Sequence, residues 1–308
     1  MSIISIPRRI TLRSTAVYMF SLFCNLIIWH SLRRKQKKLL NVLRRLEILS
    51  PNIHKRRTNV IVLIVLSLPF MYSVTGTLVC NITSESQFFA YGYELKSLTM
   101  QASAIWIKKF LNNLVHTTFP SLVVVLFCYL CLRFSFCYGY LSQKVLHYSP
   151  EEFGPSEQVE ILRQKAKIDD ILENLQDIFS LPSVFVTITH LFTCCSVVGM
   201  SITGGNFSKV NAVKSIFYGI PNLVSLIVLL WIAGSIPVEQ NKLKSAFYKR
   251  AHSRFLTVFP SEEPQCKREI LEKIDFVLNG CSIFSYTRNS ILAVFGTLLT
   301  YSLLIYQN

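Results

Sequence analysis

The apolar run at residues 286–307 restricts what this chain can fold into more than any other feature. No charged side chain occurs from residue 289 to residue 307. At a rise of about 1.5 Å per residue, a helix of about 20 apolar residues crosses a hydrocarbon core about 30 Å thick. We therefore expect residues 286–307 to form a membrane-spanning helix.

Five further apolar runs precede this one, at residues 14–32, 59–80, 114–138, 181–202 and 215–238. Charged residues make up only 16% of the chain, whereas about 25% is usual in a soluble protein. The charged residues are concentrated between the apolar runs. The sequence therefore predicts an all-α polytopic membrane protein, with residues 1–308 in one membrane domain and six visible spans.

The same composition argues against several classes of function. The net charge of +15 comes from basic residues that flank the spans rather than from a nucleic-acid-binding motif, so we expect no nucleic-acid partner. The nine cysteines show no paired spacing, so neither a disulfide framework nor a metal site is predicted. The absence of HExxH, GxSxG and paired carboxylates within the spans predicts no enzyme and no cofactor.

The distribution of Lys and Arg predicts the orientation. The segments between spans fall into two sets, with ten, four and nine basic residues in 33–58, 139–180 and 239–288, and three, three and two in 1–13, 81–113 and 203–214. The positive-inside rule places the first set in the cytoplasm and the C-terminus outside the cell. We expect the plasma membrane as the location.

Two glycosylation sequons agree with this orientation. They begin at Asn81 and Asn206, and both lie in segments placed outside the cell. Six spans would also put the N-terminus outside, which conflicts with Arg8, Arg9 and Arg13 just before the first span. An odd number of spans would remove the conflict, so we expect that one N-terminal helix is missing from this chain.

The cytoplasmic segments 33–58, 139–180 and 239–285 contain amphipathic helices near 36–50, 157–180 and 265–284. The first is basic, and its apolar stripe has two options, the inner leaflet or other helices, so membrane lipid is one expected partner. The second is acidic, with Ile161, Ile168 and Leu175 spaced by seven residues, and an anionic leaflet would repel it. We expect these helices to form an anchor region where subunits meet.

The last span resembles the signature of arthropod gustatory receptors, TYhhhhhQF, in which h is hydrophobic. Thr300, Tyr301 and Gln307 stand at the invariant positions. The chain departs from the signature at Asn308, which replaces the final Phe, and at Ser302, a polar residue within the hydrophobic stretch. These receptors are related to insect odorant receptors and have an inverted topology compared with G-protein-coupled receptors.

The resemblance implies a ligand-gated, non-selective cation channel of taste type. It implies seven helices, a homo- or heterotetramer of related subunits, and a central pore lined by the last helix. The pore-lining side chains would be Thr300, Leu303, Leu304 and Gln307, which lie three or four residues apart. Ordinary helix packing is the alternative role for the two leucines.

The ligand of such a receptor would be a small-molecule tastant held in the outer halves of the other spans. Aromatic and polar residues there are the candidates, namely Tyr18, Tyr72, His116, Phe119, Phe192, Phe217 and Tyr218. Each of them has ordinary core packing as its alternative. Two further polar residues have structural expectations: His190 is expected to be hydrogen-bonded within its span, and Arg133 is expected to mark the cytoplasmic boundary.

Two other classes of function remain as alternatives. A G-protein-coupled receptor would carry Asp-Arg-Tyr and Asn-Pro-x-x-Tyr signatures, which are absent here, and its C-terminus would be inside the cell. A small-molecule transporter would need ionisable groups or broken helices near the midplane, and the spans contain almost no charged residue.

Overall fold

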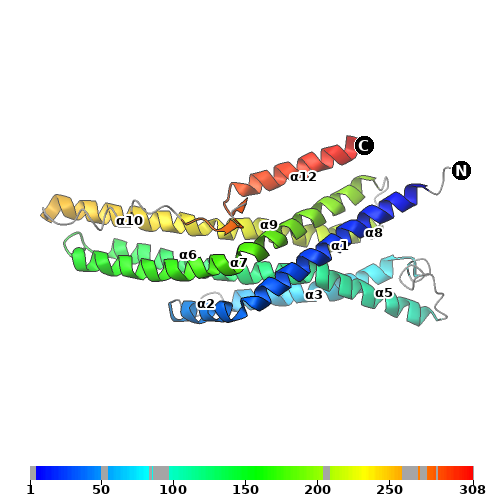
Figure 1. Cartoon of the computed structure of the whole chain (residues 1–308), viewed down its shortest axis with the longest axis horizontal. Coiled ribbons are helices and arrows are strands. Elements are labelled where there is room, and N and C mark those ends of the chain that lie inside the picture. Colours follow the sequence, from blue (N-terminus) through cyan, green and yellow to red (C-terminus); the bar gives the residue numbers. More distant parts are fainter. Residues whose placement is uncertain are drawn as a thin grey trace.

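The computed structural model describes the backbone of residues 5–49, 55–82, 85, 97–203, 209–258, 270, 276–281 and 284–307. It describes the side chains of the same residues except 5–18, 55, 200–203, 258, 302–303 and 305–307. The described parts of the chain form an elongated bundle of helices that run roughly along one axis (Figure 1).

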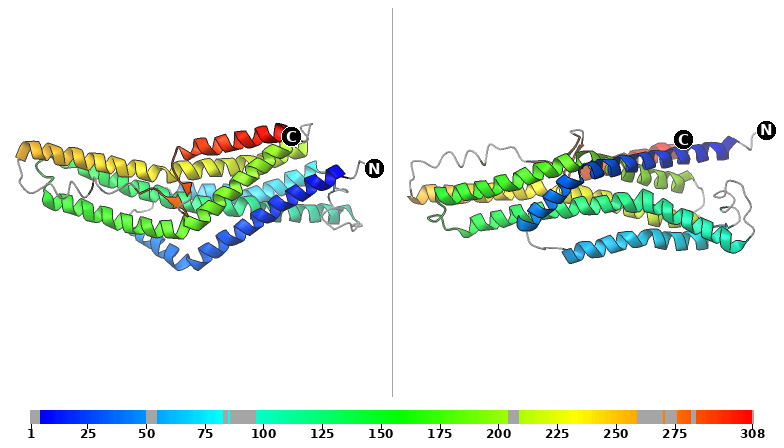
Figure 2. Two further views of the ribbon diagram at one scale, coloured as in Figure 1. Left: turned by 45° about the horizontal axis from the view of Figure 1, so that its top comes forward. Right: turned by 60° about the horizontal axis from the view of Figure 1, so that its bottom comes forward.

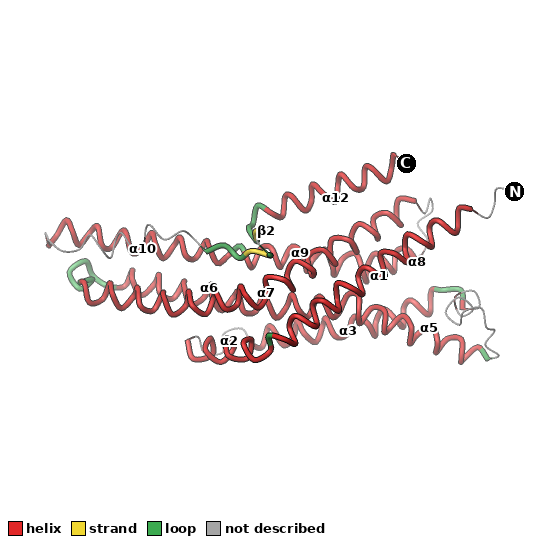
Figure 3. The backbone as a smooth tube through the Cα atoms, in the orientation of Figure 1, coloured by secondary structure: helices red, strands yellow, loops and turns green. Residues whose placement is uncertain are grey.

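The elements are α1 (Ser5–Arg34), α2 (Gln36–Leu49), α3 (Lys55–Val79), α5 (Leu98–Asn113), η1 (Leu114–Thr118), α6 (Phe119–His147), α7 (Pro155–Thr203), α8 (Lys209–Lys214), η2 (Ser215–Gly219), α9 (Ile220–Ala233), α10 (Ser235–Val258), β1 (Asn279–Gly280), β2 (Phe284–Ser285) and α12 (Ser290–Gln307). The segments η1 and η2 are single π-helical turns, and they join their neighbours into continuous helical rods (Figure 3). The predicted all-α class is confirmed, with one two-stranded hairpin added.

Long apolar helices account for the predicted spans. Within the described residues, four helical runs are long and apolar enough to cross a bilayer, namely Arg56–Val79, Leu98–His147, Pro155–Gly199 and Lys209–Thr257. Ser290–Tyr301 is a shorter apolar helix. The span predicted at 14–32 falls within α1.

Several helices are much longer than a bilayer is thick. The rods that contain α6, α7 and α10 continue past the ends of α1, α3 and α12 at one end of the molecule (Figure 2). We call this part the extension and define it as residues 133–147, 155–180 and 239–258. In the extension α10 packs along α6, and the core between them includes Phe134, Tyr138 and Phe247.

The apolar stripe predicted on 157–180 faces this core. Ile161, Ile168 and Leu175 are all buried there. A polar network lies beside them, because Tyr138 donates a hydrogen bond of 2.7 Å to Asp169 and Lys165 Nζ lies 2.7 Å from the same carboxylate. The extension therefore has a packed core of its own that contains a neutralised charge pair.

The basic helix α2 packs against protein. Its stripe residues Val42 and Leu46 are buried, and Arg45 pairs with Asp170 of α7 at 2.9 Å. Of the two options for this stripe, the structure therefore favours helix packing over the inner leaflet. Figure 2 shows the elbow at which α1 gives way to α2.

Two segments differ from the sequence prediction. Residues 81–113 were expected to lie between two spans, outside the cell, yet 98–113 form α5, which begins where the Ser97 hydroxyl accepts a hydrogen bond from the Met100 N–H at 3.2 Å. This helix contains Lys109. In the structure Lys109 is buried, with its Nζ 2.7 Å from a carboxylate oxygen of Glu85 and 2.7 Å from the Gly76 carbonyl oxygen.

The helix predicted near 265–284 falls largely outside the described residues, and its last part is wrong. Residues 279–280 and 284–285 form the antiparallel strands β1 and β2, in which Asn279 pairs with Ser285. The turn contains Cys281 at φ 50°, a left-handed conformation that a helix does not contain. The side chain of Gln176, from α7, accepts a hydrogen bond of 3.0 Å from the Asn279 N–H, which helps to hold the strand.

Candidate functional site

The most unusual backbone geometry in the apolar part of the bundle is the π-helical turn, which occurs at η1 and again at η2. In η1 the N–H of Phe119 bonds to the carbonyl of Leu114, and in η2 the N–H of Ile220 bonds to the carbonyl of Ser215. Such π turns insert one extra residue into a helix and are frequent at functional sites. Two such turns within one bundle direct attention to this part of the molecule.

A proline follows each π turn. Pro120 and Pro221 have no N–H, so the carbonyls four residues earlier, at His116 and Phe217, lose their usual α-helical donor. The Phe217 carbonyl accepts a hydrogen bond from Asn113 Nδ2 at 3.5 Å instead. The prolines therefore explain both the local widening of the helices and the need for polar side chains nearby.

Polar side chains are buried around η1. His116, Thr117 and Thr118 all lie in the interior. His116 Nδ1 lies 2.9 Å from the hydroxyl oxygen of Ser21, and Asn25 Nδ2 donates a hydrogen bond of 3.0 Å to the Val115 carbonyl. These bonds attach α1 to η1. Buried polar groups are costly in an apolar bundle unless they are paired.

Asn222 connects this cluster to α7. Its Oδ1 lies 2.5 Å from Nδ1 of His190, and its Nδ2 donates to the Tyr218 carbonyl at 2.7 Å. An amide oxygen only accepts, so His190 carries its proton on Nδ1 and its Nε2 is an acceptor. Among the described residues, Nε2 of the fully buried His190 has no hydrogen-bond partner.

An aromatic group adjoins the polar cluster. The ring of Tyr72, from α3, lies 5.0 Å from the ring of Tyr218 and 5.7 Å from the ring of Phe217, measured between centroids. The Tyr218 hydroxyl accepts a hydrogen bond of 3.0 Å from Asn112 Nδ2. Aromatic surface with a few converging donors and acceptors is the composition of a site for a small organic molecule.

The chemistry available here is recognition by hydrogen bonding and stacking. Within the described part of the chain, no three His, Cys, Asp or Glu side chains are grouped so that they could hold a metal ion. The cluster offers hydroxyl, amide and imidazole groups rather than charges.

Comparison with solved structures identifies the fold. The insect olfactory receptor OR5 from Machilis hrabei matches 94% of this chain and 80% of its own chain, with a TM-score of 0.67 and 14% sequence identity. The structure of the same receptor in complex with eugenol matches with the same identity and coverage and a TM-score of 0.66. The chain has the fold of an insect olfactory receptor. No protein-family model matches it, and no curated protein matches it by sequence.

The predicted polytopic chemoreceptor fold is therefore confirmed at the level of architecture. The matched structures are those of an olfactory receptor, so the taste assignment made from the last span stays a prediction. At 14% sequence identity, the similarity concerns the fold.

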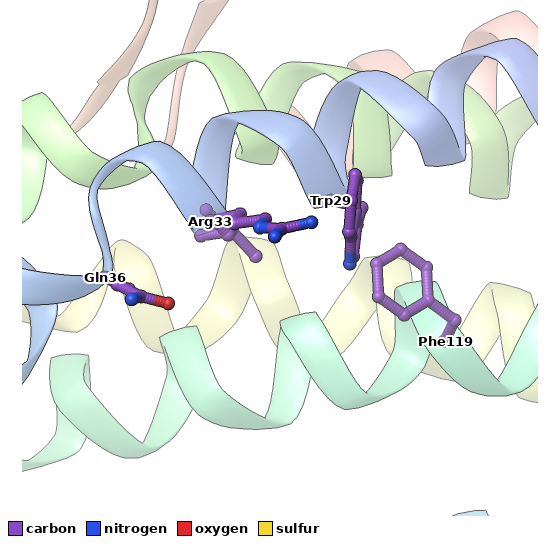
Figure 4. Close-up of a pocket in the computed structure, with 5 residues that line it drawn as sticks. Trp29, Arg33, Gln36 and Phe119 are labelled. Atoms are coloured by element: carbon purple, nitrogen blue, oxygen red, sulfur yellow. The ribbon is translucent and has the colours of Figure 1, made fainter.

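Four of the predicted ligand-pocket residues lie in or beside the cluster at η1 and η2, namely Tyr72, His116, Phe217 and Tyr218. Two others, Phe192 and Phe119, do not. Phe192 is 46% exposed and contacts the ring of Phe20 at 5.2 Å on the outer surface of the bundle. Phe119 lines a separate pocket between α1 and α6 (Figure 4), and the side chain of Tyr18 lies outside the described residues.

The sequence prediction missed much of the polar half of the cluster. Ser21, Asn25, Asn113, Thr117 and Asn222 are buried there with the predicted residues. A signal was present for two of them, because Thr117 and Asn222 lie within about one helical turn of Pro120 and Pro221, the prolines that follow the π turns. His190, expected to be hydrogen-bonded within its span, bonds to Asn222.

The predicted pore residues lie on α12, whose outer face is open in the single chain. Leu304 is 53% exposed and Tyr301 is 44% exposed, while the Thr300 hydroxyl donates a hydrogen bond of 2.9 Å to the Gly296 carbonyl of its own helix. Leu303 and Gln307 belong to the same helix, and their side chains lie outside the described residues.

Three further residues were singled out from the sequence, namely Asn81, Asn206 and Arg133. Asn81 is exposed just beyond the end of α3, and Asn206 lies outside the described residues. Arg133 is buried inside the bundle and donates a hydrogen bond of 2.9 Å to the Leu46 carbonyl. Arg133 therefore ties α6 to the last turn of α2, and its place at the cytoplasmic boundary stays a prediction.

Proposed function

We propose that this chain is a subunit of a ligand-gated, non-selective cation channel of chemosensory type in the plasma membrane. The observation that carries the proposal is the buried cluster at η1 and η2, which lies within the fold of an insect olfactory receptor. A small organic molecule binds at this cluster, and the channel opens along α12.

The cluster favours a compact molecule that is mostly apolar and has one or two polar groups. The Tyr72 and Tyr218 rings supply apolar contact, and His190 Nε2 accepts a hydrogen bond from a ligand hydroxyl. The structure of OR5 with eugenol concerns another protein, yet it supports a ligand of this kind. A tastant is the ligand class that follows from the signature on the last span.

The connection of η2 to neighbouring helices suggests how a bound ligand opens the channel. The rod containing η2 continues directly into α9, and α12 packs on both α7 and α9. A ligand that changes the hydrogen bonds of Asn222 therefore acts on the two helices that hold α12 in place. The exposed face of α12, with Thr300, Leu303, Leu304 and Gln307, lines the pore in a homo- or heterotetramer.

Basic residues at a similar position along the bundle axis indicate where the cytoplasmic surface of the membrane lies. Lys35, just after α1, pairs with Asp177 of α7, and Phe179 of α7 contacts Phe127 of α6 at 5.0 Å. Arg288, just before α12, lies 4.5 Å over the Trp231 ring. This level is the cytoplasmic edge of the bilayer, because Arg, Lys and Trp favour the interface.

This position of the membrane surface changes the predicted bounds of the third span. About 20 residues are needed to cross the bilayer, so a span that ends near Phe127 begins in α5 rather than at residue 114. The extension is then the cytoplasmic anchor region, and the C-terminus and Asn81 lie outside the cell, as the positive-inside rule predicts.

Ion currents test this function directly. The full chain is expressed alone and with related subunits, and currents are recorded during application of a panel of small aromatic and hydroxylated molecules. Cation currents that appear without G-protein activation are expected. The Tyr72→Ala and His190→Ala variants should raise the half-activating concentration about tenfold or more, because each removes a contact in the cluster.

A matched control is Phe192→Ala, which removes an aromatic ring from the same level of the bundle on its outer surface. It should leave the half-activating concentration within about twofold of the parent. Ligand responses that need G proteins, or ligand uptake without current, would support the receptor or transporter alternatives instead.

A further inference from the structure

A second pocket lies away from the cluster, where α1 ends and α2 begins. Its volume is about 460 Å³, and its lining residues are Trp29, Leu32, Arg33, Gln36 and Phe119. Figure 4 shows Gln36 at one end of this pocket, the rings of Trp29 and Phe119 at the other, and Arg33 between them with its guanidinium group toward Trp29. The pocket is therefore polar on one side and apolar on the other.

Among the described residues, the cation of the polar side has no carboxylate partner. The guanidinium carbon of Arg33 lies 4.9 Å from the centre of the Trp29 ring. The neighbouring Lys35 and Lys38 are both paired with Asp177, at 2.8 and 3.1 Å, whereas none of the ion pairs among the described residues includes Arg33. The planar guanidinium is well suited to bind a phosphate.

The apolar end faces outward along α1. Phe23 and Leu26, on the same helix, are 59% and 63% exposed, as expected for a helix whose outer side contacts acyl chains. Trp29 itself is about half exposed. An extended hydrocarbon chain that follows α1 therefore reaches the Trp29 and Phe119 rings without leaving an apolar surface.

The pocket also lies at the height expected for a headgroup. Lys35 marks the cytoplasmic edge of the bilayer in the function proposed above, and Arg33 and Gln36 flank it in the sequence. Trp29 is one helical turn further into the membrane than Arg33. The order from headgroup level to acyl level is thus Gln36, Arg33, Trp29.

We propose that this pocket binds one anionic phospholipid of the cytoplasmic leaflet. The Arg33 guanidinium and the Gln36 amide hold the headgroup phosphate, and an acyl chain lies against Trp29, Leu32 and Phe119. Basic pockets between spanning helices at this face bind anionic headgroups elsewhere. The inference rests on the membrane level assigned under the proposed function, and it adds a lipid site that is separate from the η1–η2 cluster.

The lipid would fill the wedge between α1 and α6 at the elbow. The other side of that elbow is held by Lys35 and Lys38 on Asp177, and α2 is attached to the extension by Arg45 and Arg133. The bound lipid therefore stabilises the junction between the membrane part and the extension.

Tryptophan quenching in reconstituted bilayers tests the site. The chain has three tryptophans, and a W106F/W231F protein keeps only Trp29. Phospholipids with dibrominated acyl chains quench a tryptophan that they contact. We expect dibrominated phosphatidylserine to compete for the Trp29 position about fivefold better than dibrominated phosphatidylcholine, which is the effect of about one basic residue near the headgroup.

Two pairs of variants locate the effect. Arg33→Gln should remove the preference for phosphatidylserine, while Arg34→Gln, an adjacent exposed arginine outside the pocket lining, should keep it. Arg33→Lys, which retains the charge, should keep part of the preference. A W29F/W231F protein, which keeps Trp106 on α5, should show no preference, so that a general attraction of anionic lipid is separated from binding at this pocket.

Three results would overturn the proposal. One is equal quenching of Trp29 by the two lipids, and another is an equal loss of preference in the Arg33→Gln and Arg34→Gln proteins. The third is a preference abolished by millimolar inorganic phosphate, since the site would then take a free anion. The fluorescence needs no tastant and no current, so a channel assay that fails leaves this result intact.

Discussion

The Nδ1 atom of His190 lies 2.5 Å from the amide oxygen of Asn222, and this contact joins α7 to α9 in the middle of the apolar bundle. Asn222 also reaches the Tyr218 carbonyl at 2.7 Å and the Thr117 hydroxyl at 3.5 Å. One amide side chain therefore connects α7, η1 and η2. The helices around the proposed ligand site are held at this level by polar bonds as well as by apolar packing.

We predict that Asn222→Leu destabilises the folded chain by about 1–2 kcal/mol, because His190 Nδ1 and the Tyr218 carbonyl both lose a buried partner. Thermal unfolding of the purified protein in detergent measures the change. Thr297→Ala is the control, since the Thr297 hydroxyl bonds only to the Ala293 carbonyl of its own helix. Equal shifts for the two variants would contradict a connecting role for Asn222.

A second prediction concerns the buried network of Tyr138, Lys165 and Asp169 in the extension. Asp169→Leu leaves Lys165 buried without its carboxylate, and we expect a loss of about 3–5 kcal/mol. The double variant Lys165→Met with Asp169→Leu should recover most of this loss, because no uncompensated charge remains. Denaturant unfolding followed by circular dichroism provides the measurement.

The surface pair Arg163–Glu160 is the matched control for that network. Both side chains are exposed, so Arg163→Ala should cost less than about 1 kcal/mol. If Asp169→Leu cost no more than this control, the network would contribute little to the packing of the extension.

A third prediction is a pH dependence at the elbow between α1 and α2. Hydrogen bonds from Lys35 and Lys38 hold the pKa of Asp177 below its ordinary value of 3.8. A lowered folded pKa means that the stabilisation is complete above about pH 4 and is lost as the pH falls through the folded pKa. The Asp177 side chain is 47% exposed, so the contribution is at most about 1 kcal/mol.

Comparison of the parent with Asp177→Asn checks this dependence. The difference in their free energies of unfolding should be constant from pH 5 to pH 7 and should shrink below pH 4. A difference that persists unchanged at pH 3 would show that the two lysines do not act through the charge of Asp177.

The sequence predicted those parts of the molecule that depend on local patterns. Apolar runs located the long helices because helices that could cross a bilayer need length and hydrophobicity, and the spacing of Ile161, Ile168 and Leu175 located the buried face of α7. Neither depends on which other segment lies nearby.

The parts that the sequence did not predict depend on partners far along the chain. Residues 98–113 were assigned to a segment between spans, and the burial of Lys109 against the Glu85 carboxylate and the Gly76 carbonyl is visible only in three dimensions. The β1 strand bonds to Gln176, about 100 residues earlier. Tyr72 and His116 were predicted as ligand-pocket residues from their residue types. Asn222 was not predicted, because its place in the cluster depends on contacts with His190 and Thr117 on other helices.

The last prediction concerns topology, on which the proposed pore and the lipid site both depend. Asn81 is exposed just beyond the end of α3, at the same end of that helix as Gly76 and the Lys109–Glu85 pair. If this end is extracellular, Asn81→Gln removes one glycan and Asn206→Gln removes a second, each seen as a loss of mass on a gel. An epitope tag after Asn308 should then stain intact cells. The matched control adds a sequon between Ser149 and Phe153, in the loop that joins α6 to α7 within the proposed cytoplasmic region, where no glycan should be attached. A glycan there, together with a tag reached only after permeabilisation, would invert the chain and place Arg33 at the outer leaflet, where anionic phospholipid is scarce.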